Sequence, residues 1–502
     1  MGNTRNLTLK DGFGHLEVAV HSPRLPFGSI HTEKLFPVIQ QDGIYGIDSN
    51  VQTITESGTG TVTGASNLLT CATGATQFSF STLQSKQRLR YRPGQGVVGR
   101  FTALFSTPVA DSILVAGYGT AESGVYFGYN GTDFGILYNT DGVREIQTLT
   151  VTTAATTASD VTITLNGTGY TAAVTNAGGD ATLTAYEIAQ GTYTGWTAEQ
   201  QGDTVVFLKS SAGDGGTVSF SAGTTGSAGS FAETLTGVNA TDTWIPQSTW
   251  NGDRLDGTGS SGATLDPTKG NVFQIDIQYL GFGSITFMVE IASSGNNPDF
   301  VACHTIQYPN TSTAVSIIQP SFPFTMSAYS AGSTTDVSVS TASYAGFIEG
   351  DSVLNGPRLS YTGTKSTTTA IQAIGTIRNN FVYKGRANQS LINVLDLNFT
   401  ARSANNTYTT LFIYKNATLS GTPEFTQYTT SSCSYIDVAA TTAAITDNVQ
   451  LIWSASIMEL GTIEHVFPDD IILQPGETLT FAVQTSSGTG FATVSMNTRE
   501  DH

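Results

Sequence analysis

Apolar and polar or small residues alternate in short runs along most of this chain. In the clearest case, residues 125–129 and residues 134–138 carry large apolar or aromatic side chains at alternate positions, and Asn130-Gly131 lies between them. Asn and Gly tolerate positive φ, so this pattern predicts a β-hairpin with a tight turn and one buried face. Residues 272–291 have the same extended character and are predicted to form a companion hairpin in the same sheet system.

The composition and pattern of the sequence change after Glu145. Residues 147–241 are rich in Thr, Ala and Gly and contain several short alternating runs. One segment, residues 181–190, is predicted to be a helix with Asp180 as its N-cap. The side chains predicted to face the sheet are Leu183, Tyr186 and Ile188. We therefore interpret this segment as a ββαββ module inserted into one β-sandwich.

The predicted organisation has five parts. They are an N-terminal docking arm and lead-in (1–75), the first half of the interrupted sandwich (76–146), the inserted module (147–241), the second half of the sandwich (242–352) and a C-terminal jelly-roll-like β-sandwich (353–502). Two prolines and weak periodicity near the start favour an extended arm that lies on a neighbouring subunit or on a larger assembly. The predicted fold class is all-β, with antiparallel β-sandwiches and a small β-rich insert that carries one helix.

The composition supports this class. Charged residues make up 12% of the 502 residues, against about 25% in an average globular chain. Thr suits the partly solvent-exposed face of a strand, because its branched hydroxylic side chain fits a pleated surface. A hydrophobic content of 39% is too high for a disordered chain.

The net charge of −18 argues against a nucleic-acid partner, because phosphate neutralisation needs clustered Lys and Arg. One local exception is the basic run Lys86, Arg88, Arg90, Arg92 and Arg100, of which Arg88, Arg90 and Arg92 alternate on one face of a predicted strand. Two interpretations are open. This face is either solvated or contacts an acidic neighbouring subunit, and nucleic-acid binding is disfavoured because the chain around it is acidic.

The chain shows no recognisable catalytic or metal-binding motif. Cys71, Cys303 and Cys433 lie far apart without a CxxC pattern, so we expect buried thiols instead of a zinc site or a disulfide framework. Neither GxSxG nor HExxH occurs. No run approaches 18 apolar residues, so no membrane insertion is predicted. We expect a non-enzymatic protein without a cofactor.

Three groups of residues are candidates for ligand chemistry. Trp244 and Trp250 are the candidate glycan-binding residues, because a tryptophan ring stacks on a sugar; the alternative, which we favour, is that they cap the sandwich core. Asp253 and Asp256 resemble part of a calcium loop, although their spacing is not that of an EF-hand.

The third group is the densest polar cluster of the chain, Glu464-His465 with Asp469-Asp470. Acid–base chemistry would need one carboxyl with a raised pKa beside an ionised partner. The favoured alternative is a solvated loop between strands, because Pro468 and the two aspartates are typical turn residues.

Three stretches carry a family resemblance: RYRPGQGVVGRFTALF (90–105), GYNGTDFGI (128–136), and WNGDRLDGTG with LDPTKGNVFQI (250–275). Together they resemble a family of virion structural proteins of tailed bacteriophages and large DNA viruses, most of them tail- or fibre-associated. The resemblance covers residues 76–350 and extends more weakly to the C-terminal part. The interrupted sandwich is similar in shape to concanavalin-like lectin domains, and the insert resembles the β-rich insertion modules of phage tail and sheath proteins.

The resemblance implies a virion protein, made in the host cytoplasm and located on the external surface or tail. We expect an external fibre, appendage or tail component that docks to other virion proteins through its N-terminal arm and forms a homo-oligomer, with a trimer as the expected state. Host surface glycans are a further expected contact. The alternatives are a capsid-decorating protein and a secreted carbohydrate-binding or carbohydrate-active protein.

Overall fold

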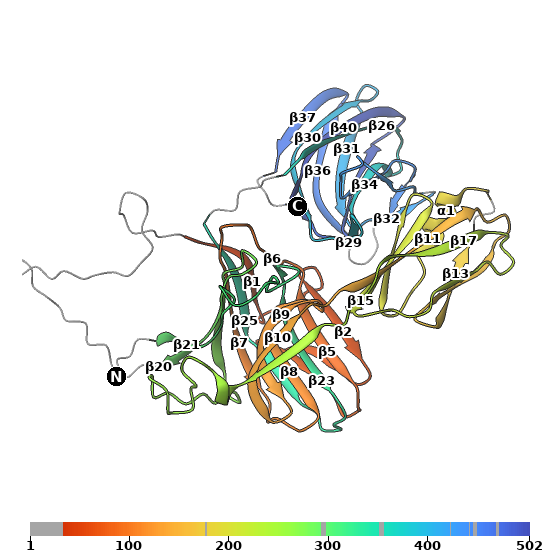
Figure 1. Cartoon of the computed structure of the whole chain (residues 1–502). Coiled ribbons are helices and arrows are strands. Elements are labelled where there is room, and N and C mark those ends of the chain that lie inside the picture. Colours follow the sequence, from red (N-terminus) through yellow and green to blue (C-terminus); the bar gives the residue numbers. More distant parts are fainter. Residues whose placement is uncertain are drawn as a thin grey trace, which may run out of the picture.

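The computed structural model describes residues 34–175, 178–292, 298–350, 356–421, 423–440, 442–444, 449–467 and 471–501. These residues form three β-rich bodies (Figure 1). We call them the large sandwich (red, orange and green), the insert (yellow) and the C-terminal sandwich (blue). Every strand pair with a named register is antiparallel, so the predicted all-β class is confirmed.

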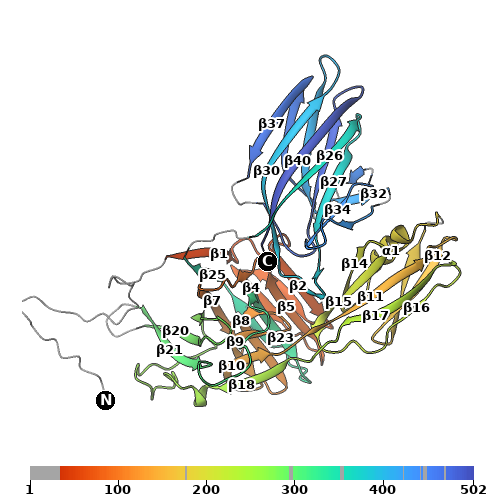
Figure 2. The ribbon, with the colours of Figure 1, turned by 45° about the horizontal axis from the view of Figure 1, so that its top comes forward.

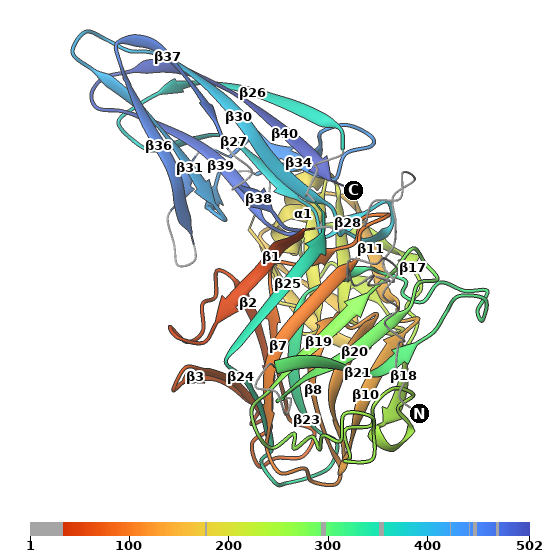
Figure 3. The ribbon, with the colours of Figure 1, turned by 90° about the vertical axis from the view of Figure 1, so that its left-hand side faces the viewer.

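Two facing sheets build the large sandwich. Within the described residues, one sheet follows the order β21 (Pro298–Ile306), β20 (Ile285–Ala292), β19 (Asn271–Ile277), β7 (Val97–Phe105), β24 (Ser338–Thr341), β4 (Leu68–Ala72), β3 (Thr61–Ala65), and β25 (Ser343–Glu349) joins β7 to β1 (Leu35–Asp42). The other follows the order β18 (Thr241–Pro246), β10 (Asp133–Thr140), β9 (Gly124–Asn130), β8 (Ser112–Gly119), β23 (Phe324–Ser330), β5 (Phe80–Ser85), β2 (Gln52–Ser57). Figure 3 looks onto the first sheet, where β25, β7, β19 and β20 lie side by side.

The predicted hairpin of residues 125–138 forms as β9 and β10, with its turn one residue later than expected. Asn130 pairs with Asp133, and Gly131 has φ +60°. Gly at the first central position is typical of a type II′ turn, whose twist matches that of the strands. The turn therefore depends on Gly131 and not on Asn130.

The second predicted hairpin, β19 with β20, lies in the opposite sheet and packs face to face with the first. The Phe127 ring centroid lies 4.7 Å from that of Phe273 and 5.4 Å from that of Phe287. These rings are fully buried, together with Phe101, Phe105 and Phe324. Alternate-residue burial on two facing ribbons thus makes an aromatic core between strands on both sides of the insert in the sequence.

The structure differs from the predicted boundary of the N-terminal arm. β1 pairs with β25, β2 pairs with β5, and β4 pairs with β24, so residues from Leu35 onward belong to the large sandwich. The reason is packing: Ile39, Leu69 and Cys71 are buried in its core. The remainder of the predicted arm, residues 1–33, lies outside the described residues.

The insert contains seven described strands where the pattern predicted four. One sheet has the order β14 (Trp196–Gln201), β15 (Thr204–Ala212), β11 (Arg144–Thr153), β17 (Ala228–Leu235), and the other has the order β13 (Thr168–Val174), β12 (Ser159–Leu165), β16 (Ser219–Ser221). α1 (Ala181–Ala189) is capped by Asp180, whose Oδ1 accepts a hydrogen bond from the Thr182 amide at 2.8 Å.

The buried face of α1 differs from the predicted one. Ile188 is buried as expected, but the other buried side chains are Thr184 and Ala185, and Leu183 and Tyr186 are only half-buried. α1 is the only α-helix among the described residues, and its nine residues are too few to cross a membrane.

The C-terminal sandwich also has two sheets. In its described part, one has the order β26 (Arg358–Thr367), β40 (Gly490–Asp501), β30 (Leu391–Arg402), β37 (Leu460–Val466), with β38 (Ile472–Leu473) beside β30. The other has the order β33 (Thr426–Gln427), β34 (Ser434–Asp437), β27 (Gln372–Asn379), β39 (Thr478–Thr485), β31 (Tyr408–Lys415), β36 (Gln450–Met458). Figure 2 shows β37 at the outer edge of this body.

Three short ribbons complete the described strands: β6 (Leu89–Arg90) with β22 (Ser321–Phe322), β28 (Val382–Tyr383) with β29 (Arg386–Ala387), and β32 (Thr418–Ser420) with β35 (Thr442–Ala444). β6 lies where the large sandwich meets the C-terminal sandwich, and β28 lies where the insert meets the C-terminal sandwich.

Candidate functional site

The two candidate glycan-binding tryptophans have different environments. Trp250 is 2% exposed, and its ring centroid lies 6.1 Å from that of Phe127 and 6.2 Å from that of Phe134. Its ring faces are therefore used by the core and not available to a sugar. Trp244 lies on β18, opposite Leu137 of β10, and is half-buried. Of the pair, only Trp244 keeps accessible surface for stacking.

The two candidate calcium ligands brace their own loop. Asp253 Oδ1 accepts a hydrogen bond from the Leu255 amide at 2.9 Å, and Oδ2 accepts one from the Ser261 amide at 2.6 Å. Asp256 Oδ1 accepts hydrogen bonds from the amide and hydroxyl of Thr258 at 2.9 and 2.6 Å. A cation bound here would have to compete with these donors. No group of three or more His, Cys, Asp and Glu side chains suited to a metal occurs among the described residues.

These contacts set the pKa of Asp253. Burial of the carboxyl raises the pKa, but the hydrogen bonds from Ser261 and Leu255 to the ionised form outweigh it, so the net pKa lies below the usual value. The carboxylate is thus held charged as a structural acceptor.

The predicted polar loop around Glu464 is a strand in its described part. Glu464 and His465 lie on β37; Glu464 Oε1 accepts a hydrogen bond from Asn398 Nδ2 at 3.1 Å, and the His465 ring lies 5.3 Å from the Trp453 ring. Residues 468–470, with both aspartates of the cluster, lie outside the described residues.

The three cysteine thiols are buried and free, as expected. Burial raises the pKa of Cys71 to about 12 and raises the pKa of Cys303 and Cys433 further. A thiol with such a pKa is an inert core side chain, because the thiolate is the reactive form.

The basic run meets its acidic partner within the same chain. Only Leu89 and Arg90 form a strand there, and the Arg90 and Arg92 guanidinium groups bind the Asp501 carboxylate with N–O distances of 3.1 and 2.8 Å. Asp501 ends β40, more than 400 residues away, and is 4% exposed. The contact joins the large sandwich to the C-terminal sandwich, so the interpretation of a solvated face is wrong for Arg90 and Arg92.

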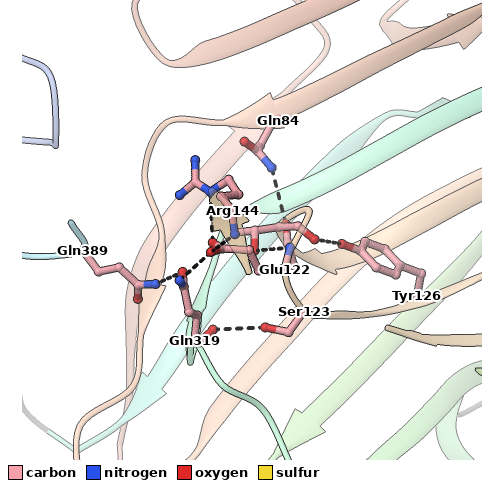
Figure 4. Close-up of polar contacts among 9 residues, drawn as sticks. Gln84, Glu122, Ser123, Tyr126, Arg144, Gln319 and Gln389 are labelled. Carbon is pink, nitrogen blue, oxygen red and sulfur yellow. Dashed lines mark hydrogen bonds and ion pairs between the residues drawn. The ribbon is translucent and has the colours of Figure 1, made fainter. Parts of the chain in front are cut away.

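A second junction centres on Glu122, in the turn between β8 and β9 (Figure 4). Glu122 is 1% exposed; its Oε2 lies 3.1 Å from Arg144 Nε, at the start of the insert, and its Oε1 accepts a hydrogen bond from Gln319 Nε2 at 2.7 Å. Gln319 Oε1 in turn accepts a hydrogen bond from Gln389 of the C-terminal sandwich. One buried carboxylate therefore links all three bodies.

A third junction joins the insert to the C-terminal sandwich. The Arg378 guanidinium lies over the Phe425 ring at 4.0 Å and donates a hydrogen bond to the Gln200 carbonyl of the insert. Glu199 accepts hydrogen bonds from the amides of Phe381 at 2.8 Å and Val382 at 3.3 Å. Burial raises the pKa of Glu199, opposed mainly by the charge of Arg378. An apolar cluster lies beside these groups and comprises Ile146, Val206, Leu208, Val382 and Ala387.

A cavity of about 570 Å³ lies between the large sandwich and the C-terminal sandwich. Its basic lining residues are Lys86, Arg88, Arg90, Arg92 and Lys415, and its acidic ones are Glu477 and Asp501. The lining thus carries three more positive than negative groups, in a chain with a net charge of −18. Asn50 and Gln87 also line it and are exposed, so the cavity opens to solvent.

Sequence reasoning identified the basic run but missed the acids Asp501, Glu122 and Glu477. No local signal could have found them, because each partner is distant in sequence from the group that it binds. The alternation of Arg88, Arg90 and Arg92 was the one available sign of an acidic partner.

Comparisons with known proteins give distant structural likenesses. No protein-family model matches the chain, and no curated protein matches its sequence. A lectin UEA-II complexed with galactose is similar at 6% identity over 63% of this chain and 98% of that chain, with a TM-score of 0.22. The binding domain of botulinum neurotoxin DC in complex with SialylT is similar at 7% identity over 89% and 94%, with a TM-score of 0.25. A structure described as the triple jelly roll fold and turret assembly in an archaeal virus is similar at 6% identity over 90% of each chain, with a TM-score of 0.16.

Proposed function

We propose that this protein is a non-enzymatic structural component of a virion surface, an external fibre, appendage or tail part, that assembles as a homotrimer. The observation that carries the assembly is the free edge of the C-terminal sandwich. β36 ends one sheet and β37 ends the other, and the single residue Glu459 joins them, so both edges lie on the same side of the body. Among the described strands, β36 pairs only with β31 and β37 only with β30.

The chemistry of this edge supports contact with another chain. β36 is nine residues long and has no charged side chain. An exposed, uncharged edge strand is a template for pairing with another strand, and monomeric proteins usually block such edges with charge or proline. Four large apolar side chains of the two strands are exposed: Leu451, Met458, Leu460 and Val466.

A second copy of this chain is the partner that we propose for the edge. Because β36 and β37 are two unlike edges, β36 of one copy can pair with β37 of the next, and such a heterologous contact closes into a ring when the rotation allows it. The buried polar junctions between the three bodies suit a rigid particle component, and the virion location rests on the family resemblance.

The mass of the full chain in solution tests the assembly. Light scattering after size-exclusion chromatography should give three times 52.7 kDa, about 158 kDa. The double variant Leu451→Lys with Leu460→Lys should shift the mass to 52.7 kDa, because it puts charge on both edges. Leu280→Lys is the matched control, because Leu280 is 71% exposed and Leu460 is 73% exposed. A wild-type monomer at high concentration, or equal effects of the two variants, would contradict the proposal.

A capsid-decorating protein and a secreted carbohydrate-binding or carbohydrate-active protein are the alternatives. Imaging of intact particles labelled with an antibody to this chain separates the proposed fibre or tail part from a capsid-decorating protein, because it places the protein on the tail or on the capsid shell. Release of reducing ends from host glycans by the purified protein would instead support a carbohydrate-active protein.

A further inference from the structure

Two neighbouring loops at one end of the large sandwich expose large apolar side chains. Leu280 and Phe282 lie in the turn between β19 and β20 and are 71% and 42% exposed, and Val315, in the segment between β21 and β22, is 42% exposed. The Ser316 amide donates a hydrogen bond to the Gly281 carbonyl at 2.8 Å, so the two loops lie against each other. We call Leu280, Phe282 and Val315 the apolar tip.

The backbone of the apolar tip is held in a strained conformation. Leu280 has φ +38°, a left-handed value that a leucine rarely adopts. The Leu280 amide donates a hydrogen bond to the Tyr91 hydroxyl at 3.1 Å, and the Tyr279 hydroxyl donates one to the Ile317 carbonyl at 2.7 Å. The Tyr91 and Tyr279 rings pack edge to face, with their centroids 4.8 Å apart. These contacts fix the backbone of a leucine whose side chain stays in solvent, and strain of this kind is typical of a site that contacts another molecule.

The sequence around the apolar tip contains no charged residue. Residues 277–289 and 305–335 include no Asp, Glu, Lys, Arg or His, in a chain with a net charge of −18. Polar groups of the two loops bond within the loops: the Gly283 amide donates to the Tyr279 carbonyl at 2.6 Å, and the Thr311 hydroxyl donates to the Tyr308 carbonyl at 2.8 Å. The apolar part of a bilayer disfavours charged side chains and unsatisfied backbone groups, whereas a protein partner imposes neither restriction. The lack of charge and the internal hydrogen bonds therefore favour a lipid surface as the partner.

We infer that the apolar tip adsorbs to the surface of a zwitterionic lipid bilayer. Leu280, Phe282 and Val315 would enter the boundary between headgroups and acyl chains, roughly 5–10 Å deep. The half-buried rings of Tyr91 and Tyr279 lie behind them and would sit at the level of the headgroups, where the amphipathic ring of tyrosine is favoured. Adsorption of this kind is shallower than the insertion against which the lack of a long apolar run argues. Anionic lipids are disfavoured, because the net charge of −18 opposes them.

Co-sedimentation of the full chain with phosphatidylcholine vesicles tests the inference. We expect saturable binding that is equal at low and high salt, because the contact is apolar, and weaker binding when phosphatidylserine is added to the vesicles. Leu280→Asn should weaken the partitioning by about ten-fold. Its unfolding temperature should stay at the wild-type value or above it, because asparagine tolerates positive φ better than leucine. Phe282→Gln is the second variant and should act in the same direction.

Ile44→Gln is the matched control, because Ile44 is 59% exposed in the loop between β1 and β2, and it should bind vesicles like the wild type. A fluorescent label then reports the position of the tip directly. The native thiols are buried, so a polarity-sensitive maleimide dye labels only the new thiol of Leu280→Cys or, as its control, of Ile44→Cys. Phosphatidylcholine vesicles should shift the emission of the dye at position 280 to shorter wavelength and leave the dye at position 44 unchanged.

Four results would overturn adsorption of the apolar tip. They are a wild type that does not sediment with the vesicles, a Leu280→Asn variant that binds as tightly as the wild type, an equal loss in Ile44→Gln, and binding that high salt abolishes or phosphatidylserine strengthens. A dye at position 280 that shifts with rising protein concentration in the absence of vesicles would also overturn it and would assign the tip to a contact between copies. The mass of the same samples reports the proposed trimer separately, so failure of assembly and failure of adsorption are distinguishable.

Discussion

The contact of Asp501 with Arg90 and Arg92 predicts that one substitution loosens the C-terminal sandwich from the large sandwich. In Asp501→Asn, two guanidinium groups lose their common counter-ion while they stay partly buried, with 16% and 20% of the side chain exposed. Removal of one partner of a fully buried ion pair costs about 3–5 kcal/mol. Because these arginines keep some solvent, we expect a smaller loss, about 2–4 kcal/mol.

Differential scanning calorimetry of the full chain measures this loss. In a unit of about 150 residues, 1 kcal/mol shifts the unfolding temperature by roughly 2–4 °C, so about 3 kcal/mol predicts a downward shift of roughly 6–12 °C in the transition of the C-terminal sandwich. The expected signature is a transition that separates from that of the large sandwich, because the bodies lose a coupling contact and multidomain unfolding need not be two-state.

Asp203→Asn is the control for this prediction. Asp203 is an exposed aspartate in the turn between β14 and β15 of the insert, so its substitution should leave both transitions within about 1 °C of the wild type. If Asp501→Asn unfolds with the wild-type profile, the ion pairs do not stabilise the junction and the reasoning is refuted.

Two further predictions concern the residues first considered for ligand binding. Trp250→Ala should destabilise the large sandwich by about 3–5 kcal/mol, because it removes a core ring that packs on Phe127. Trp244→Ala should lower the free energy of unfolding by less than half as much. Urea unfolding followed by fluorescence compares the two variants, and equal losses would contradict the assignment of Trp250 to the core. The lowered pKa of Asp253 means that its ionised form stabilises the fold above the unfolded-state pKa of about 4, and that this contribution disappears as the pH falls through the lower folded-state pKa. The unfolding temperatures of the wild type and Asp253→Asn should therefore differ at pH 7 and converge toward pH 2, and a gap that stays constant with pH would count against this role of the carboxylate.

Local pattern was sufficient to predict two hairpins of the large sandwich and the helix of the insert. Alternation at residues 125–138 and 272–291 predicts strands that the structure contains, because burial of one face of a ribbon imposes a period of two on the sequence. The helix after Asp180 follows in the same way from the chemistry of its first turn. These features depend on residues only a few positions apart, and such residues can be read directly from the sequence.

Only the tertiary structure decided which faces meet. Whether Trp250 lies in the core or on the surface depends on Phe127 and Phe134, more than 100 residues away, and the acidic partner of Arg90 and Arg92 is the last described residue, Asp501. An ion pair or a ring contact needs only that two groups approach within a few ångströms, and it leaves no periodic trace in either segment. The amino-acid pattern therefore determined the two hairpins and the presence of the helix, while the packing of distant segments decided the buried face of the helix, the junctions, the cavity and the free edge.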